Sequence, residues 1–369
     1  MLLTDFLFLK YIAAQLIANL ELSNKQFRLN MVKLSKKKYL LPIIILCILM
    51  GLIPVLFIEC AGKKEVLTIV FAGDLMLDRG TRNITAVKGV DDYFESVHNA
   101  ISSSDFTVAN LECVACDTTC KPLDKTFTFR ANPEWISSLY KNGITHLVVA
   151  NNHSFDFGAR GMKQTIFNLL FSGIKPIGYS QNNDATSTPT LLNKGNDSVA
   201  IFSSCLLKQN NRFVNSENTT SLSEKISVFK LKHPTYIILV CLHWGVEMNT
   251  LPTKEQILQA HQLIRAGANA IIGHHPHVVQ PIEVYKGKYI FYSLGNFIFD
   301  NHHSPANRGV MAKLCLSKRS IAVQVLPFNI IKSKPILMKR EDSEDFRKEI
   351  SLVSKTIDLK QQNGIWEVF

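Results

Sequence analysis

Six mostly apolar runs in this chain each end in a small polar cluster, and this recurring pattern restricts the fold more than any other feature. The runs are short and rich in Val, Ile, Leu and aromatic residues, which is typical of buried strands in a parallel sheet. Because the carboxyl ends of parallel strands meet at one edge of a sheet, the polar clusters are expected to converge there. The runs cover residues 66–72, 105–109, 145–150, 236–242, 268–272 and 288–293.

Amphipathic segments alternate with these strands, and the alternation predicts an α/β fold. The clearest helix begins at Thr253, which forms a capping box with Gln256, and ends at Gly267. Further helices are predicted at residues 91–100, 132–142 and 161–171.

Three imidazoles fall within four residues in the sequence Gly273-His274-His275-Pro276-His277, directly after one of the strands. Imidazole is the commonest neutral metal ligand, and a His-x-His pair in an extended segment puts two rings on one side. Alone, the cluster is equally typical of a surface loop. Together with the polar residues at the other strand ends, it predicts a site for two divalent metal ions. The candidate ligands are Asp74, Glu112, Asn152, His243, His275 and His277.

Each candidate also has an ordinary structural explanation. Asp74 could cap a helix, Asn152 could shape a turn, and His243 could simply pack beside Trp244. Six such residues in suitable places are hard to obtain by accident, which favours the metal site. His274 is expected either to face a substrate or to hydrogen-bond to the backbone.

Residues 39–58 form twenty consecutive positions without a charge, a length that suits a membrane-spanning helix. Four lysines precede them, so residues 1–38 are expected to stay in the cytoplasm and the main domain to lie outside it, in a single-pass protein of the cell membrane. A buried core helix is the alternative. Glu59-Cys60 matches a lipoprotein processing site poorly, which favours an uncleaved anchor. Met31 opens a more natural start than Met1, so residues 1–30 could be a mis-assigned extension.

The net charge of +11 does not indicate nucleic-acid binding, because more than half of it lies beside the predicted span. Residues 1–64 contain nine Lys or Arg against three Asp or Glu. No basic face with interleaved aromatic residues stands out in the rest of the chain.

Three of the eight cysteines, Cys113, Cys116 and Cys120, are clustered in a predicted loop. In an exported domain this spacing allows a disulfide of Cys120 with either Cys116 or Cys113, and the sequence does not choose between them. A zinc or iron–sulfur site is the alternative, although a fourth ligand of the usual kind is not close by.

Six short motifs follow one another along the chain. They are, in order, Gly-Asp-Leu-Met-Leu, Asn-Leu-Glu, Ala-Asn-Asn-His-Ser-Phe-Asp-Phe-Gly, His-Trp-Gly-Val-Glu, Gly-His-His-Pro-His and Tyr-Ser-Leu-Gly-Asn-Phe. Together they resemble the CapA family, whose members are associated with poly-γ-glutamate capsule synthesis and are related to calcineurin-like metallophosphoesterases. The resemblance implies a layered α/β/β/α domain over residues 66–328, which leaves residues 329–369 as a charged tail.

The resemblance implies roles within the predicted metal site. Asp74 resembles the first acidic ligand, Glu112 takes the place of the bridging aspartate, and Asn152 resembles the amide ligand. One position departs from the wider phosphoesterase pattern, because Met76 stands where an Asp-x-His sequence would have its imidazole. A thioether is a poor ligand for hard divalent ions, so one metal position is weakened. The remaining imidazole ligands are His243, His275 and His277.

Other residues of the motifs are candidates for catalysis and substrate binding. His153 and His274 are the candidate catalytic side chains, and Asp156 is expected to orient a neighbouring imidazole. Arg130 is a candidate clamp for a carboxylate or phosphate, since a guanidinium can bind either through two hydrogen bonds. An ordinary surface arginine is the alternative. The other candidate substrate contacts are Asn110 and Asn296, the latter also expected to buttress the site.

Three functions are compatible with these features. The first is a membrane-anchored, outward-facing capsule-assembly protein whose domain holds two divalent ions of manganese, zinc or iron. It would support synthesis, transport or attachment of poly-γ-glutamate or another anionic envelope polymer, alongside membrane proteins of capsule synthesis. The second is a metal-dependent hydrolase of a phosphoester or amide in the cell envelope. The third is a non-catalytic scaffold that binds a polyanion.

Overall fold

The computed structural model describes residues 66–179, 188–207, 213–301, 303–317 and 320–369. The predicted span at residues 39–58, both candidate starts and Cys60 lie outside them. Within the described ranges, no helix combines the length and the apolar character needed to cross a membrane. The chain from Glu65 to Phe369 forms one compact unit.

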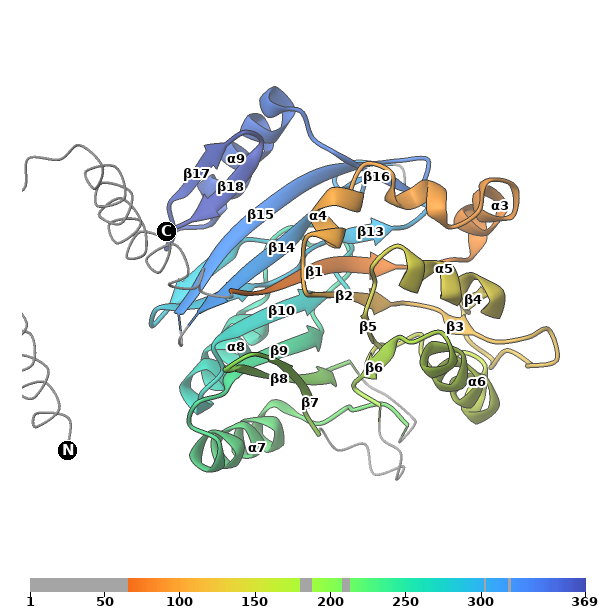
Figure 1. Cartoon of the computed structure of the whole chain (residues 1–369), viewed down its shortest axis with the longest axis horizontal. Helices are drawn as coiled ribbons and strands as arrows, with labels where there is room; N and C mark the ends of the chain where they lie inside the picture. The colour runs from red at the N-terminus through yellow and green to blue at the C-terminus, as the bar shows by residue number, and fades with distance from the viewer. Residues whose placement is uncertain (1–65, 180–187, 208–212, 302, 318–319) are drawn as a thin grey trace, which may run out of the picture. The chain divides into compact units, whose positions relative to one another are not determined.

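The larger of two main sheets contains the first three predicted strands (Figure 1). Its strands are β1 (Leu67–Leu75), β2 (Phe106–Leu111), β5 (His146–Val148), β6 (Lys175–Ile177), β13 (Asn296–Ile298), β14 (Arg308–Ser317), β15 (Ser320–Ile331), β16 (Lys334–Leu337), β17 (Leu359–Gln362) and β18 (Ile365–Val368). In the described part of the chain their order is β17-β18-β15-β14-β1-β2-β5-β6, with β13 beside β1 and β16 beside β15. The strands β1, β2, β5 and β6 are parallel, so their carboxyl ends meet at one edge.

The second main sheet carries the other predicted strands. Its strands are β7 (Thr190–Lys194), β8 (Asp197–Cys205), β9 (Ile237–His243), β10 (Ala270–His274), β11 (Ile282–Tyr285) and β12 (Lys288–Phe291). Among the described residues the order is β11-β12-β10-β9-β8-β7, and the central strands β8, β9, β10 and β12 are parallel. A separate short pair consists of β3 (Val114–Ala115) and β4 (Arg130–Ala131).

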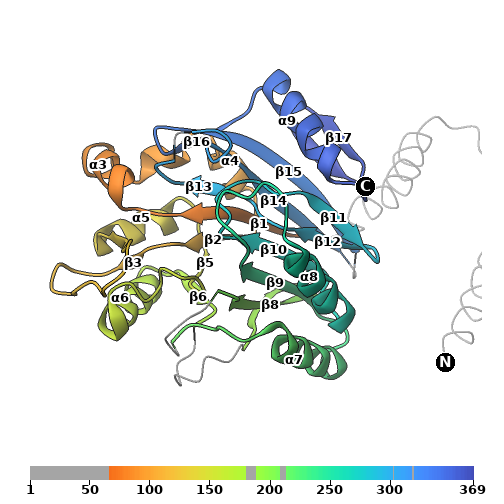
Figure 2. The same cartoon turned by 180° about the vertical axis from the view of Figure 1, so that it is seen from behind.

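Helices connect the strands, and most of them cover the outer faces of the two sheets, whereas α9 (Arg340–Val353) packs against the core between the sheets (Figure 2). They are α3 (Arg79–Lys88), η1 (Asp91–Phe94), α4 (His98–Ser102), η2 (Pro133–Trp135), α5 (Ile136–Lys141), α6 (Gly158–Phe171), α7 (Thr219–Lys232), α8 (Lys254–Ala266) and α9 (Arg340–Val353). The predicted capping box of α8 is confirmed. The Thr253 hydroxyl accepts from the Gln256 amide at 3.1 Å, and the Gln256 side chain accepts from the Thr253 amide at 2.9 Å.

Alternation of side chains along the strands explains the layers. In β1, Ile69 and Phe71 face the interior between the sheets, where they share one apolar core with Leu239 of β9. Val70 points to the other face, into a core with residues of α5 and α6. The outer face of the second sheet packs against α7 and α8 through residues such as Val240. The predicted α/β class is therefore confirmed, with two sheets packed face to face between helices.

Several predicted elements differ in extent. The helix expected at residues 91–100 is divided into η1 and α4, and neither α3 nor α7 was predicted. The α7 sequence is rich in Ser, Thr and Lys and buries few apolar side chains, so its helical periodicity is weak.

Residues 329–369 are not a tail outside the domain. The strands β16 and β18 pair with β15, and β17 pairs with β18. Trp366 is fully buried, and Phe346 of α9 packs against its ring with centroids 5.4 Å apart. The domain thus continues to Phe369 and does not end at residue 328. The prediction was wrong because the sequence of α9 is rich in charged residues and its few apolar residues do not stand out.

Neither of the two disulfides considered for the cysteine cluster is present. Cys113, Cys116 and Cys120 are all free thiols and all buried. Cys116 and Cys120 pack with Val114 and Phe157 in a small apolar cluster. The alternative metal site is not supported either, since none of these thiols belongs to a potential metal-binding group among the described residues.

Candidate metal centre

The predicted strand-end clusters converge where the two sheets meet. Two glycines allow the close approach of backbones that this requires. A Cβ atom on Gly73 would lie 1.9 Å from the carbonyl oxygen of Gly295, and one on Gly273 would lie 2.0 Å from that of Tyr292. The Gly-Asp and Gly-His sequences therefore place Asp74 and the histidine cluster against neighbouring strand ends.

Asp74 is fully buried at the end of β1 and is surrounded by donors. Its Oδ1 accepts from Asn110 Nδ2 at 2.8 Å and lies 3.3 Å from His274 Nδ1. Its Oδ2 lies 3.4 Å from His277 Nδ1. Burial would raise the pKa of Asp74, but His274 and His277 outweigh burial and hold this pKa well below its usual value. Asp74 is thus a carboxylate anion beside two imidazoles, those of His274 and His277.

Glu112 is also fully buried, but it lacks hydrogen bonds. Neither side-chain oxygen has a hydrogen-bond partner among the described residues. Its Oε1 lies 3.6 Å from His277 Nε2 and 3.8 Å from His243 Nε2. Burial raises the pKa of Glu112 well above its usual value, and nearby carboxylates add to this. A buried carboxylate without hydrogen bonds is costly, and the nearest cationic group is the imidazole of His277, 3.6 Å away. Glu112 is therefore the clearest sign of a site for a further cation.

The histidine cluster forms a tight turn rather than an extended segment. His275 and His277 both have positive φ angles, of 97° and 60°, a conformation that is costly for residues other than Gly. The two rings lie 5.9 Å apart between centroids. The sequence predicted that an extended segment would put these two side chains on the same side. The structure brings both imidazoles together by means of a turn instead.

The pKa values of three imidazoles of the site, those of His243, His275 and His277, differ because their neighbours differ. Burial lowers the pKa of His275 to about 4, and the charge of His277 adds to this. Burial also lowers the pKa of His243 well below its usual value. For His277 burial acts in the same direction, but Glu112 and Asp74 outweigh it and raise its pKa to about 10. The imidazoles of His243 and His275 are thus neutral, which is the form that binds metals. The imidazole of His277, between Asp74 and Glu112, holds a proton.

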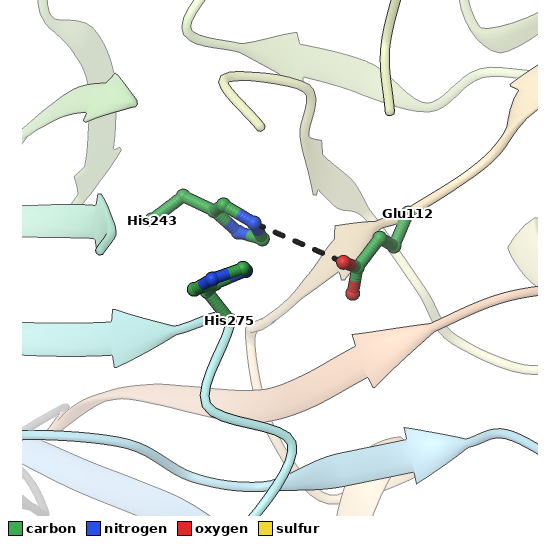
Figure 3. A group of neighbouring side chains, drawn as sticks. All are labelled: Glu112, His243 and His275. Atoms are coloured by element: carbon green, nitrogen blue, oxygen red, sulfur yellow. Dashed lines mark ion pairs between the residues drawn. The ribbon is translucent and has the colours of Figure 1, made fainter. Parts of the chain in front are cut away.

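Five of the six predicted ligands occur in compact groups that could hold a metal ion (Figure 3). Within each group, one ligand atom per residue lies within 4.8 Å of the others. Figure 3 shows the Glu112 carboxylate and the rings of His243 and His275 turned toward one another. The sixth residue, Asn152, has its Oδ1 2.8 Å from His243 Nε2. The two fully buried groups are Glu112, His243 and His275, and Asp74, Glu112 and His277.

His153 stands beside this cluster and is held by Asp156. Its Nδ1 lies 2.8 Å from Asp156 Oδ2, and its ring stacks on Phe129 at 4.2 Å between centroids. Asp156 is fully buried and also accepts from the Phe129 amide and from Lys125. The predicted orienting role of Asp156 therefore has a matching geometry, with His153 as the imidazole that it orients.

Asn110 and Asn296 do not lie where a substrate could touch them. Both are fully buried behind the candidate ligands. Asn110 donates to Asp74, while Asn296 Oδ1 lies 2.9 Å from His277 Nδ1 and its Nδ2 donates to the His277 carbonyl at 3.2 Å. They are positioning residues for Asp74 and His277, and their assignment as substrate contacts is corrected because the ligands cover them.

His274 and Arg130 also lie away from the expected positions. His274 is buried at the end of β10, and neither of its ring nitrogens has a hydrogen-bond partner among the described residues. The Arg130 guanidinium lies 5.8 Å from the centre of the Phe157 ring, while its backbone amide donates to Asp78 at 2.6 Å. In the described structure Arg130 makes no contact with the histidine cluster.

Met76 does not belong to the candidate metal centre. Its side chain is fully buried in the apolar core of the larger sheet, and its sulfur accepts from the Asp78 amide at 3.0 Å. The position that the wider phosphoesterase pattern fills with an imidazole thus contributes no ligand here.

Three residues at the site were not predicted. Asn151 is fully buried and donates to Asn110 Oδ1 at 3.0 Å, which extends the hydrogen-bond chain behind Asp74. Glu247 is exposed and forms a third potential metal-binding group with His275 and His277. The Arg79 guanidinium lies 5.8 Å from the centre of the Phe129 ring. Asn151 and Glu247 stand within motifs that the sequence singled out, whereas Arg79 has no local signal beyond its position after Asp78.

The donor set fits a divalent ion. Buried carboxylate oxygens and imidazole nitrogens without hydrogen-bond partners converge from several strand ends, including both oxygens of Glu112 and Nδ1 of His275. A cation between them would satisfy these atoms together and offset the cost of burying Glu112.

Comparisons with known proteins identify relatives along most of the domain. The chain is 30% identical over 317 residues to the PGA biosynthesis protein CapA of Bacillus subtilis, covering 83% of this chain and 81% of that protein. It is 30% identical over 286 residues to the capsule biosynthesis protein CapA of Bacillus anthracis, covering 74% of this chain and 70% of that protein.

A solved phosphatase structure from Mycoplasma pneumoniae overlaps with a TM-score of 0.40 at 13% identity, covering 75% of this chain and 92% of that one. This likeness is too low to support an argument. Residues 68–301 match the family described as bacterial capsule synthesis protein PGA_cap. The resemblance to CapA is therefore confirmed, and the chain belongs to the PGA_cap family of bacterial capsule synthesis proteins.

Proposed function

We propose that this chain is an envelope protein of capsule synthesis whose domain binds divalent metal ions and acts on an anionic polymer such as poly-γ-glutamate. The capsule role is supported by the family and by the CapA relatives. The metal is supported chiefly by Glu112, a fully buried carboxylate without hydrogen-bond partners among the described residues. Such a group is stable only when it is protonated or paired with a cation.

The centre would hold two ions, of manganese, zinc or iron. The two buried ligand groups share Glu112, which suits a carboxylate that bridges two metals. Asn152 would join the group that contains His243, since the amide oxygen already lies 2.8 Å from that imidazole. Two packed sheets between helices, with the ligands at their strand ends, are in keeping with a metallophosphoesterase-type domain.

When bound, such ions polarise the bond to be broken and activate a water molecule at neutral pH. The chain's own residues would position the substrate and move protons. Asp156 holds Nδ1 of His153, which leaves Nε2 as the nitrogen that exchanges a proton with the substrate. Arg79 is half exposed, pairs with Asp300 through its Nε at 3.2 Å and lies over Phe129 beside His153. Its remaining donors make it, in place of Arg130, the candidate partner of an anionic group.

The apolar segment at residues 39–58 supports a single-pass anchor in the cell membrane, with the domain outside the cytoplasm. Membrane proteins of capsule synthesis would then be its partners. Protease treatment of intact cells tests this arrangement, because an outward-facing domain is degraded and a cytoplasmic one is protected.

A scaffold that binds a polyanion without catalysis is the second candidate, and the position of Met76 favours it. The sulfur of Met76 lies in the apolar core and contributes no ligand, so one metal position has fewer ligands than the wider phosphoesterase pattern supplies. A centre with fewer ligands binds metal less tightly and could serve binding rather than turnover.

One experiment separates these functions. The purified full-length chain is supplemented with manganese or zinc, its bound metal is measured, and hydrolysis of a generic phosphoester and of poly-γ-glutamate is followed. Glu112→Ala and His275→Ala serve as controls. Bound metal with hydrolysis that both variants lose supports the hydrolase, and bound metal without hydrolysis supports the scaffold. Metal content near zero after supplementation would contradict any metal-dependent function.

A further inference from the structure

The loop between β9 and α8 brings an exposed carboxylate to the histidine turn. The loop is tied to that turn by a hydrogen bond of 2.9 Å from the Met248 amide to the Pro276 carbonyl. Met248 has a φ of 62°, so the backbone reverses directly after Glu247. A side-chain oxygen of Glu247 and ring nitrogens of His275 and His277 lie within 4.8 Å of one another.

One of the two buried ligand groups has fewer neighbouring ligand residues than the other. The group of Glu112, His243 and His275 has Asn152 as a further neighbour. The group of Asp74, Glu112 and His277 has no such addition, because Met76 keeps its sulfur in the core. Glu247 lies beside His277, a member of this poorer group, and beside His275 of the other group.

His274 is the other residue that could fill the gap, but its position does not suit the role. Its Nδ1 lies 3.3 Å from Asp74 Oδ1, so it is close to one ligand. However, no potential metal-binding group among the described residues includes His274. Its ring is buried beneath the cluster at the end of β10, whereas Glu247 approaches from the solvent side.

We propose that Glu247 is a metal ligand that completes the centre from the solvent side and compensates for the missing imidazole at position 76. This inference rests on the proposed metal centre. His277 belongs both to the group with Asp74 and Glu112 and to the group with Glu247, so a cation at the weaker position would have these three carboxylates around that imidazole. An oxygen-rich set of this kind favours a hard ion such as Mn²⁺ over softer ions.

The test measures Mn²⁺ binding by calorimetry to the full-length chain after chelator treatment. Glu247→Gln keeps the shape of the side chain but removes its charge. Glu255→Gln is the matched control, because Glu255 is an exposed carboxylate on the neighbouring α8 whose side chain accepts from Gln259. We expect Glu247→Gln to lose one bound ion, or at least tenfold in affinity for it, and Glu255→Gln to bind as the unaltered chain does.

The outcomes distinguish this inference from the proposed function. Unchanged number and affinity of bound ions in Glu247→Gln, with the unaltered chain binding Mn²⁺, would overturn the role of Glu247 and leave the metal centre intact. An unaltered chain that binds neither Mn²⁺ nor Zn²⁺ would overturn both. Thermal unfolding in chelator separates loss of a ligand from loss of the fold. Because Glu247 is exposed, its variant is expected to unfold at the same temperature as the unaltered chain.

Discussion

Replacing Glu112 by Gln should stabilise the metal-free chain and reduce the stability that bound metal adds. In a chelator, the variant replaces a buried carboxylate that lacks hydrogen-bond partners among the described residues by a neutral amide of the same shape. The amide still buries polar atoms, so the gain is the difference between burying a charged group and burying a neutral one, which is on the order of 1–3 kcal/mol. For a domain of this size, about 2 °C per kcal/mol gives a Tm higher by roughly 2–6 °C.

With metal the advantage of the variant shrinks or reverses. At a free metal concentration 100 times its Kd, the unaltered chain gains about 2.7 kcal/mol of unfolding free energy. If the neutral amide weakens binding 100-fold, the variant gains only about 0.4 kcal/mol at the same concentration. The difference of about 2.3 kcal/mol reverses the order when the advantage in chelator is about 1–2 kcal/mol, and offsets most of an advantage of about 3 kcal/mol.

The assay is thermal unfolding of both chains in chelator and in a series of Mn²⁺ or Zn²⁺ concentrations. Glu283→Gln is the matched control, because the Glu283 carboxylate is satisfied by Tyr292 at 2.5 Å and His261 at 2.8 Å. It should lower the Tm equally in both conditions. A Glu112→Gln variant that is less stable in chelator, or that gains as much from metal as the unaltered chain, would refute the reasoning.

Three further predictions concern other parts of the domain. Removing the α8 cap with Thr253→Ala should lower the unfolding free energy by about 1 kcal/mol in urea and leave metal affinity unchanged; an unshifted urea midpoint would count against the capping box. The pKa of His146 is lowered to about 4 by burial, so the unfolded chain takes up a proton first as pH falls below 6.5. Relative to His146→Gln, the unaltered chain should therefore lose about 3 kcal/mol between pH 7 and pH 4, and parallel pH profiles in urea unfolding would contradict this. Asp156→Asn should reduce hydrolysis at least tenfold with little change in bound metal, because it frees the His153 ring; equal loss of both would show instead that Asp156 supports the ligands.

The strand ends and most of the candidate ligands could be predicted because the signals for them are local. A buried parallel strand is a short apolar run, and a polar residue at its end must lie at the ligand-binding edge of the sheet. Asp74, Glu112, His243, His275 and His277 were identified in this way, and the structure brings them into compact groups. The capping box of α8 was equally local, since it depends on two residues three positions apart.

The extent of the domain could not be predicted from local signals. The strands β17 and β18 are short, and β18 pairs with β15, some forty residues earlier in the chain. The sequence of α9 is strongly charged, so its few buried residues, such as Phe346, do not stand out. Their stabilising partners belong to distant segments, and only the folded chain shows that residues 329–369 belong to the domain.

By itself, the sequence determined the α/β class, the edge of the sheets where the site lies and the residue types that meet there. Only the tertiary structure decided which of those side chains reach the centre and which stand behind it. Asn110 and Asn296 are covered by the ligands that they orient, Met76 turns into the core, and Glu247 reaches the histidine turn from a loop. The physical reason is that residue type and period specify the face and the end of a strand. The direction of a side chain in a turn depends instead on backbone angles and on contacts with segments far away in the chain.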